Sequence, residues 1–160
     1  MTILYRIFSL IISIFAFFIS LSLLLLIPAS LVMPPVWLPI FLLVAVVLYT
    51  WFSNKFQRLV LRHNEVVRTS LRDWVKVNGY VTIVFSLLSL PGAFALLKNP
   101  DVYMANMTEM MGKMGNHSSQ VFTERSAIIL ASIMIIYFLI LLVHVFWTFA
   151  LIKKNEQYFQ

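Results

Sequence analysis

The chain has 160 residues, of which 61% are apolar and 11% are charged, and its mean hydropathy of +0.92 far exceeds that of an ordinary soluble domain. The formal net charge is +6, and no nucleic-acid-binding motif accompanies it, so we expect no nucleic-acid partner. The absence of cysteine excludes disulfide exchange, thiolate catalysis and iron–sulfur clusters.

Four stretches of the sequence carry no charged residue: 7–27, 36–52, 80–97 and 127–152. About 20 apolar residues, rising about 1.5 Å each, cross a hydrocarbon layer of about 30 Å. We therefore predict one all-α transmembrane domain over residues 1–160, a bundle of four membrane-spanning helices.

The first span is expected to be retained as an anchor. Its apolar run, residues 7–27, is too long for a signal-peptide core of about 7–15 residues.

Small residues recur on the first and third spans at intervals of four, three and four, which predicts faces where helices pack closely. These residues are Ser9, Ser13, Ala16 and Ser20 on the first span, and Thr82, Ser86, Ser89 and Ala93 on the third.

The segment between the second and third spans, residues 55–77, alternates charged and apolar residues with helical periodicity. This pattern predicts one amphipathic helix, with Asn54 as its N-cap and Asn78 and Gly79 at its end. The helix could lie at the membrane interface or extend the neighbouring spans. Alternatively, its cations could hold a phosphate or carboxylate of a lipid or soluble ligand. The candidate binding residues are Arg58, Arg62, His63, Arg68, Arg72 and Lys76.

The distribution of Lys and Arg predicts the orientation of the spans. Residues 1–6, 53–79 and 153–160 carry nine of the twelve, whereas the two segments expected on the opposite side carry three. The positive-inside rule then places both ends and the 55–77 segment in the cytoplasm. We expect the chain in the inner (plasma) membrane of a bacterium, with anionic lipid headgroups facing its basic segment.

The loop over residues 98–125, expected outside the cytoplasm, is rich in methionine. Thioethers are soft ligands that favour Cu(I), so this loop is a candidate metal site. A short helix resting on the membrane would show the same pattern, because methionine is also an adaptable apolar residue. The candidate ligands are Met104, Met107, Met111, Met114 and His117.

Two further features lie within the predicted spans. Pro91 interrupts the third span, which predicts a kink or hinge. His144 lies within the fourth span, where an ionisable side chain is costly and indicates either a functional role or a hydrogen-bonded neutral imidazole. Thr82 and Ser86 on the third span are its expected hydroxyl partners.

No catalytic motif is present: the sequence lacks HExxH, a Gly-rich phosphate loop and a spaced Ser, His and Asp set. We therefore expect a non-catalytic membrane protein that binds lipid or a partner membrane protein and forms a homo-oligomer or a complex, with no resident cofactor. One alternative is an accessory protein that binds or exports Cu(I) through the methionine-rich loop. The other is a small transporter or lipid-handling enzyme that uses His144.

Overall fold

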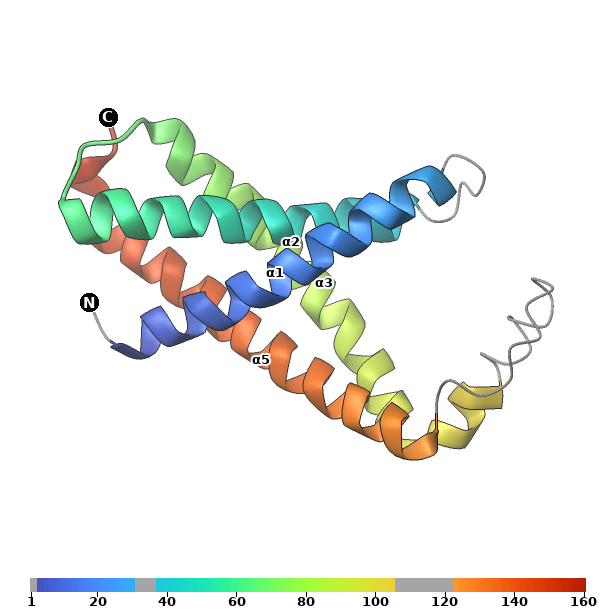
Figure 1. Cartoon of the computed structure of the whole chain (residues 1–160). Coiled ribbons are helices and arrows are strands. Elements are labelled where there is room, and N and C mark those ends of the chain that lie inside the picture. Colours follow the sequence, from blue (N-terminus) through green and yellow to red (C-terminus); the bar gives the residue numbers. More distant parts are fainter. Residues whose placement is uncertain (1–2, 31–36, 106–122) are drawn as a thin grey trace. The chain divides into compact units, whose positions relative to one another are not determined.

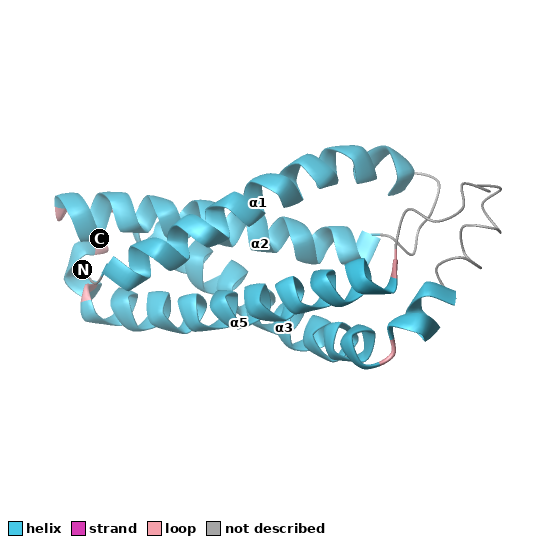
Figure 2. Cartoon of the chain, turned by 60° about the horizontal axis from the view of Figure 1, so that its bottom comes forward, coloured by secondary structure: helices cyan, strands magenta, loops and turns pink. Residues whose placement is uncertain are grey.

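The computed structural model describes residues 3–30, 37–105 and 123–160. Four long helices account for most of them: α1 (Ile3–Ser30), α2 (Trp37–Phe56), α3 (Thr69–Lys98) and α5 (Glu124–Lys154) (Figure 1). Figure 2 shows that loops form only a small part of the described chain. Each of the four helices is long and apolar enough to cross a membrane. The predicted all-α chain with four such helices is confirmed for the described residues.

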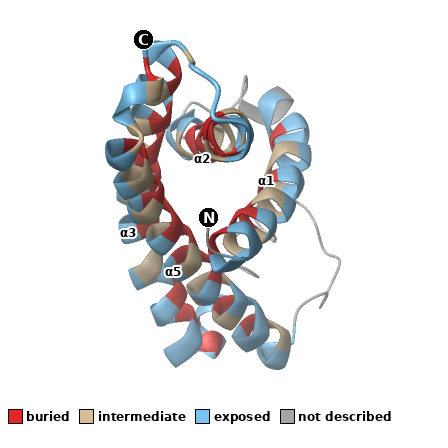
Figure 3. Ribbon diagram, turned by 90° about the vertical axis from the view of Figure 1, so that its left-hand side faces the viewer, coloured by how far each residue is buried: buried red, intermediate tan, exposed pale blue. Residues whose placement is uncertain are grey.

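The surfaces of these helices are strongly apolar. On α1, for example, Phe17 and Leu24 are each 67% exposed and Leu25 is 77% exposed. Figure 3 shows that each long helix carries buried positions on part of its surface and exposed positions on the rest. Large apolar side chains exposed over whole helices are stable in hydrocarbon and costly in water, so the exposed faces suit a lipid environment.

The prediction of a single amphipathic helix over residues 55–77 is wrong. The helix of α2 continues as a π-helix, η2 (Gln57–Arg62), and the chain then leaves helical geometry until α3 begins at Thr69. Asn64 takes a positive φ of 54°, which asparagine tolerates better than most residues and which ends the preceding turn. Consequently Asn54 lies inside α2 and Asn78 inside α3, where neither caps a helix.

The end of the chain holds the irregular segment between η2 and α3 in place. After the 3-10 turn η3 (Glu156–Tyr158), Phe159 forms a parallel bridge with Val67. The amide of Val67 donates to the carbonyl of Tyr158 at 2.8 Å, and the amide of Gln160 donates to the carbonyl of Val67 at 3.0 Å. These backbone bonds satisfy groups that a continuous helix would have paired internally.

Contacts group the chain into two compact units, Met1–Phe85 with Ile140–Gln160, and Ser86–Leu139. In the first unit, Gly79 of α3 allows a close approach to α5. A Cβ atom at Gly79 would lie 2.7 Å from Cε1 and Cζ of Phe149, closer than real Cβ contacts. Glycine at this position therefore leaves room for the ring of Phe149 against the backbone of α3.

The second unit has a small apolar core in which Leu96 packs with Ala127 and Ala131, and half-buried Met104 lies against it. The start of α5 is capped reciprocally: the amide of Thr123 donates to Oγ of Ser126, and the amide of Ser126 donates to Oγ1 of Thr123. The helix α3 continues through Pro91, and a short helix follows over residues 100–105.

Candidate functional site

A polar cluster in the interior of the first unit surrounds Tyr49, which lies on α2 and is fully buried. Its hydroxyl lies 2.8 Å from Nδ1 of His144 and donates to Oγ1 of Thr148 at 3.0 Å. The hydroxyl of Tyr5, from α1, lies 3.0 Å from the same Oγ1. Three helices thus meet in one hydrogen-bonded cluster, the tyrosine–histidine cluster, formed by Tyr5, Tyr49, His144 and Thr148.

The hydrogen-bond directions within this cluster assign one tautomer to His144. Thr148 donates its single hydroxyl proton to the backbone carbonyl of His144 at 2.7 Å, so its oxygen can only accept from Tyr5 and Tyr49. Tyr49 uses its proton for Thr148 and therefore accepts at its contact with Nδ1. Nδ1 of His144 then carries a proton, and in the neutral ring Nε2 presents a bare lone pair.

Nε2 of His144 is a buried polar atom without a described hydrogen-bond partner. His144 is 1% exposed, and Nε2 has no hydrogen-bond partner among the residues that the structure describes. The ring of Tyr5 stacks on the imidazole with centroids 4.8 Å apart and an angle of 12° between the planes. The expected partners Thr82 and Ser86 are also buried, but the hydroxyl at Nδ1 comes from Tyr49. Tyr49 of α2 is thus the partner of Nδ1, in place of the expected hydroxyls of α3. A functional role of His144 stays a prediction.

A second polar cluster, the amide–hydroxyl cluster, joins α1 to the end of α2. Oγ of Ser9 lies 2.7 Å from Oδ1 of Asn54 and 2.9 Å from Oε1 of Gln57, and Nδ2 of Asn54 donates to Oγ of Ser13 at 2.8 Å. A hydroxyl has one proton, so Ser9 donates to only one of the two amide oxygens. Exchanging the amide nitrogen and oxygen of Gln57 makes its nitrogen the donor to Ser9. Gln57 then donates to Ser9, Ser9 donates to Asn54, and Asn54 donates to Ser13.

A groove of about 390 Å³ lies beside this cluster, at the end of α2 and along η2. We call it groove 1; its lining residues are Trp51, Asn54, Lys55, Gln57, Arg58 and Arg62. Three cations and no carboxylate therefore line it. Ser9 of α1 contacts Asn54 and Gln57, which both line the groove. The packing of α1 on α2 and η2 therefore positions these two amides.

A second groove of about 480 Å³, groove 2, lies on the neighbouring side of the same helix end. Its apolar lining includes Phe52, Leu59, Leu71 and Trp74, and its charged lining consists of Lys55, Glu65 and Arg68. Lys55 thus lines both grooves. His144 lines neither of them, so neither groove supplies the pocket that a transporter or enzyme acting through His144 requires.

The six residues of the 55–77 segment that were predicted as ligands do not all line one groove. Arg58 and Arg62 line groove 1, and Arg68 lines groove 2. Exposed His63 and half-buried Lys76 line neither.

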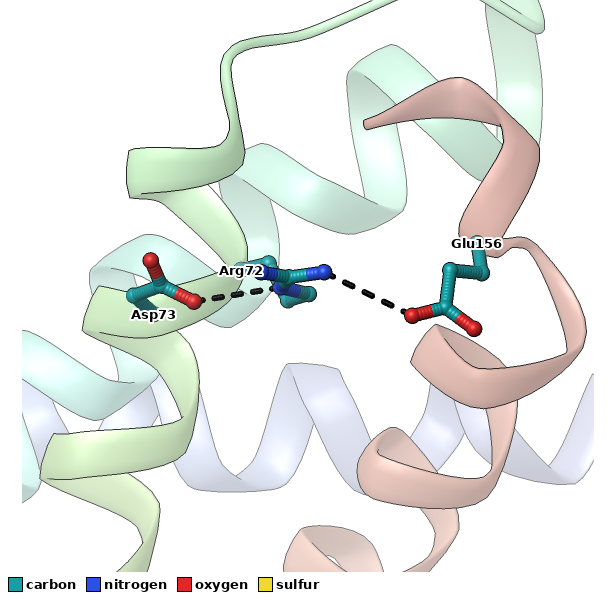
Figure 4. A network of polar contacts seen from close by, with 3 residues as sticks. All are labelled: Arg72, Asp73 and Glu156. Atoms are coloured by element: carbon teal, nitrogen blue, oxygen red, sulfur yellow. Dashed lines mark hydrogen bonds and ion pairs between the residues drawn. The ribbon is translucent and has the colours of Figure 1, made fainter. Parts of the chain in front are cut away.

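Arg72 has carboxylate partners instead. Its Nε lies 3.1 Å from Oδ1 of Asp73, and its Nη1 lies 3.5 Å from Oε1 of Glu156 (Figure 4). The second contact adds an ion pair to the backbone bonds that hold the end of the chain. Both carboxylates are more than half exposed, so we expect each pair to contribute less than about 1 kcal/mol.

The predicted methionine site is only partly covered by the structure. Met104 packs against the core of the second unit, whereas Met107, Met111, Met114 and His117 lie outside the described residues. In the described part of the chain, no group of three or more His, Cys, Asp or Glu side chains is placed to hold a metal ion. Binding of Cu(I) by the methionines stays a prediction.

The polar residues that sequence reasoning missed are Tyr5, Tyr49 and Thr148, together with the amides of Asn54 and Gln57. Two spacings in the sequence could have indicated these residues. Thr148 follows His144 by one helical turn, and Tyr5, Ser9 and Ser13 recur at intervals of four, so they share one face of α1.

No family model matches the chain, and neither the curated proteins nor the solved structures contain a significant match.

Proposed function

We propose that the chain is a non-catalytic membrane protein that binds the headgroups of anionic lipids in groove 1. The observation that carries the proposal is the composition of this groove: Lys55, Arg58 and Arg62 line it and no carboxylate does. None of the three forms an ion pair with another described residue, since the ion pairs of the described chain involve Arg72. Their charge is therefore available to a ligand.

The chemistry of the lining favours a phosphate. Arginine presents a planar fork of donors that matches phosphate oxygens, and the amides of Asn54 and Gln57 add neutral polar groups beside it. Trp51 is 65% exposed at the same level of the helix. Tryptophan favours the boundary between hydrocarbon and headgroups, so it would hold the groove at the depth of the lipid phosphates.

The proposed orientation supports the same ligand. We propose that four crossings place both chain ends and the η2 segment in the cytoplasm, because most Lys and Arg residues lie on that side. The cytoplasmic leaflet attracts basic segments next to the membrane by about 1 kcal/mol per cation. Arg58 and Arg62 are four residues apart on η2, and both line groove 1.

The test is a lipid titration of the purified protein followed by native mass spectrometry. Dioleoylphosphatidylglycerol is expected to bind more tightly than dioleoylphosphatidylcholine. The double substitution Arg58→Gln with Arg62→Gln should weaken phosphatidylglycerol binding by about 2 kcal/mol, or about 30-fold, because two cations are lost.

The matched control removes the same charge elsewhere. Lys153 and Lys154 are exposed at the end of α5 and line neither groove. Changing both to Gln should leave phosphatidylglycerol binding within about twofold of the original, as expected for exposed charges outside the site. Unchanged binding in the Arg58 and Arg62 variant, or an equal loss in the control, would overturn the proposal.

A further inference from the structure

The two grooves run side by side on the end of α2 and share one cation. Trp51, Lys55 and Arg58 are spaced by four and three residues in groove 1, and Phe52, Lys55 and Leu59 are spaced by three and four in groove 2. Residues at such spacings lie on one face of a helix, so the grooves form two neighbouring stripes. Lys55 belongs to both stripes and lies between them.

The combined charge of the grooves exceeds what one phosphodiester can match. Lys55, Arg58, Arg62 and Arg68 line the two grooves together, against the single carboxylate of Glu65. A phosphodiester carries one negative charge. A ligand with two phosphodiesters, one in each groove, would match more of the positive charge while using Lys55 for both.

The apolar lining indicates that the ligand is a lipid. Phe52, Leu59, Leu71 and Trp74 give groove 2 a wall suited to acyl chains. Phe52 stacks on Trp51 with centroids 5.6 Å apart and on Trp74 with centroids 5.6 Å apart. This row of three aromatic rings passes from groove 1 to groove 2, and its two tryptophans are the residue type that favours the headgroup level of a membrane.

From these observations we propose that the preferred ligand is a lipid whose two phosphodiesters are joined by a short bridge, as in diphosphatidylglycerol (cardiolipin). One phosphate lies with Arg58 and Arg62 in groove 1, the other lies with Arg68 in groove 2, and Lys55 contacts both. This inference rests on the proposed function, since it names the lipid class for the same site. Glu65 opposes the second phosphate and limits the gain in affinity.

The test uses native mass spectrometry with tetraoleoyl cardiolipin and dioleoylphosphatidylglycerol, titrated separately at equal phosphate concentration. Cardiolipin should bind at least about fivefold more tightly, the effect expected of one further cation near a phosphate. Arg68→Gln should remove this preference, lowering cardiolipin affinity about fivefold while phosphatidylglycerol affinity stays within about twofold. Arg68 lies in the exposed segment before α3, so its loss is not expected to disturb folding.

Two further variants test the effect of the Glu65 carboxylate on lipid affinity and provide a control for the loss of a cation. Glu65→Gln should strengthen cardiolipin binding, because it removes the carboxylate next to the second phosphate. Lys153→Gln removes a cation outside both grooves and should change neither affinity by more than about twofold.

The outcomes separate this inference from the proposed function. If phosphatidylglycerol binds through Arg58 and Arg62 but cardiolipin binds no more tightly, only the two-phosphate inference fails. The same conclusion follows if Arg68→Gln leaves the cardiolipin preference intact. If neither lipid binds, the proposed function fails and the inference fails with it. The same holds if the double variant Arg58→Gln with Arg62→Gln binds both lipids as tightly as the original protein does.

Discussion

The substitution Tyr49→Phe is expected to lower the free energy of unfolding by about 1–2 kcal/mol, because it leaves a buried polar group without a partner. The hydroxyl of Tyr49 donates to Thr148, and in the assigned tautomer it accepts from Nδ1 of His144, 2.8 Å away. Without it, the imidazole N–H has no acceptor in an interior that excludes water. Measured hydrogen bonds between membrane helices average about 0.6 kcal/mol and reach about 1.7 kcal/mol, and the unpaired N–H puts this case at the upper end.

Tyr5→Phe is the matched control for this prediction. It also removes one buried tyrosine hydroxyl, but Thr148 still accepts from Tyr49 and the ring of residue 5 can still stack on His144. The loss should be no more than about 0.6 kcal/mol. Unfolding of both variants in mixed micelles, by titration with sodium dodecyl sulfate, compares them directly. An equal or larger loss for Tyr5→Phe would contradict the assignment of protons within the tyrosine–histidine cluster.

Asn54→Leu is expected to weaken the packing of α1 on α2 by about 1–2 kcal/mol. Asn54 accepts from Ser9 and donates to Ser13, so its loss removes two hydrogen bonds between the helices at once. The measurement is again the free energy of unfolding in mixed micelles. Lipid binding is not a suitable readout for this variant, since Asn54 also lines groove 1.

Two serines of α1 provide the control pair. Ser13 and Ser22 each donate to the backbone carbonyl four residues earlier in α1, but Ser13 also accepts from Asn54. Ser13→Ala should therefore lower stability by about 0.6 kcal/mol or more, whereas Ser22→Ala should change it by less than about 0.5 kcal/mol. Equal effects of the two serines would mean that the amide–hydroxyl cluster does not contribute to stability.

The four long helices were predictable because their cause is local. An uninterrupted apolar run of sufficient length must satisfy its backbone groups internally when it lies in hydrocarbon, and the helix is the simplest structure that does so. The helices extend beyond the apolar runs, as at Thr69 of α3, because helical geometry does not require apolar residues outside the hydrocarbon layer.

The break over residues 64–68 was not predictable from periodicity. The alternation of charged and apolar residues continues through it, and the backbone bonds that favour the break come from Tyr158 and Gln160, at the far end of the chain. Periodicity reports the local preference for a helix, whereas this segment is determined by pairing with a distant one. The positive φ of Asn64 is the local contribution, and one asparagine is too weak a signal to predict it.

The candidate site was predictable in its residue types but not in its pairings. A histidine in a span requires a partner, and small hydroxyl residues on α3 were the nearest guess. The actual partner, Tyr49, is separated from His144 by 95 positions in the chain and lies on another helix. The pairing of residues between helices depends on the rotation of each helix about its axis, and periodicity along the sequence does not reveal that rotation. Likewise, Arg58, Arg62 and Arg72 were all predicted as ligands, and only the structure reveals that Arg72 has carboxylate partners.

The proposed membrane crossings and the proposed cytoplasmic position of η2 underlie the whole account, and labelling of single cysteines tests them directly. The natural chain has no cysteine, so each variant carries one thiol. In intact cells, a membrane-impermeant maleimide should label Lys98→Cys, and it should label His63→Cys and Lys154→Cys only after lysis. Labelling of His63→Cys from outside the cell would place grooves 1 and 2 on the side opposite to the proposed one and contradict the account.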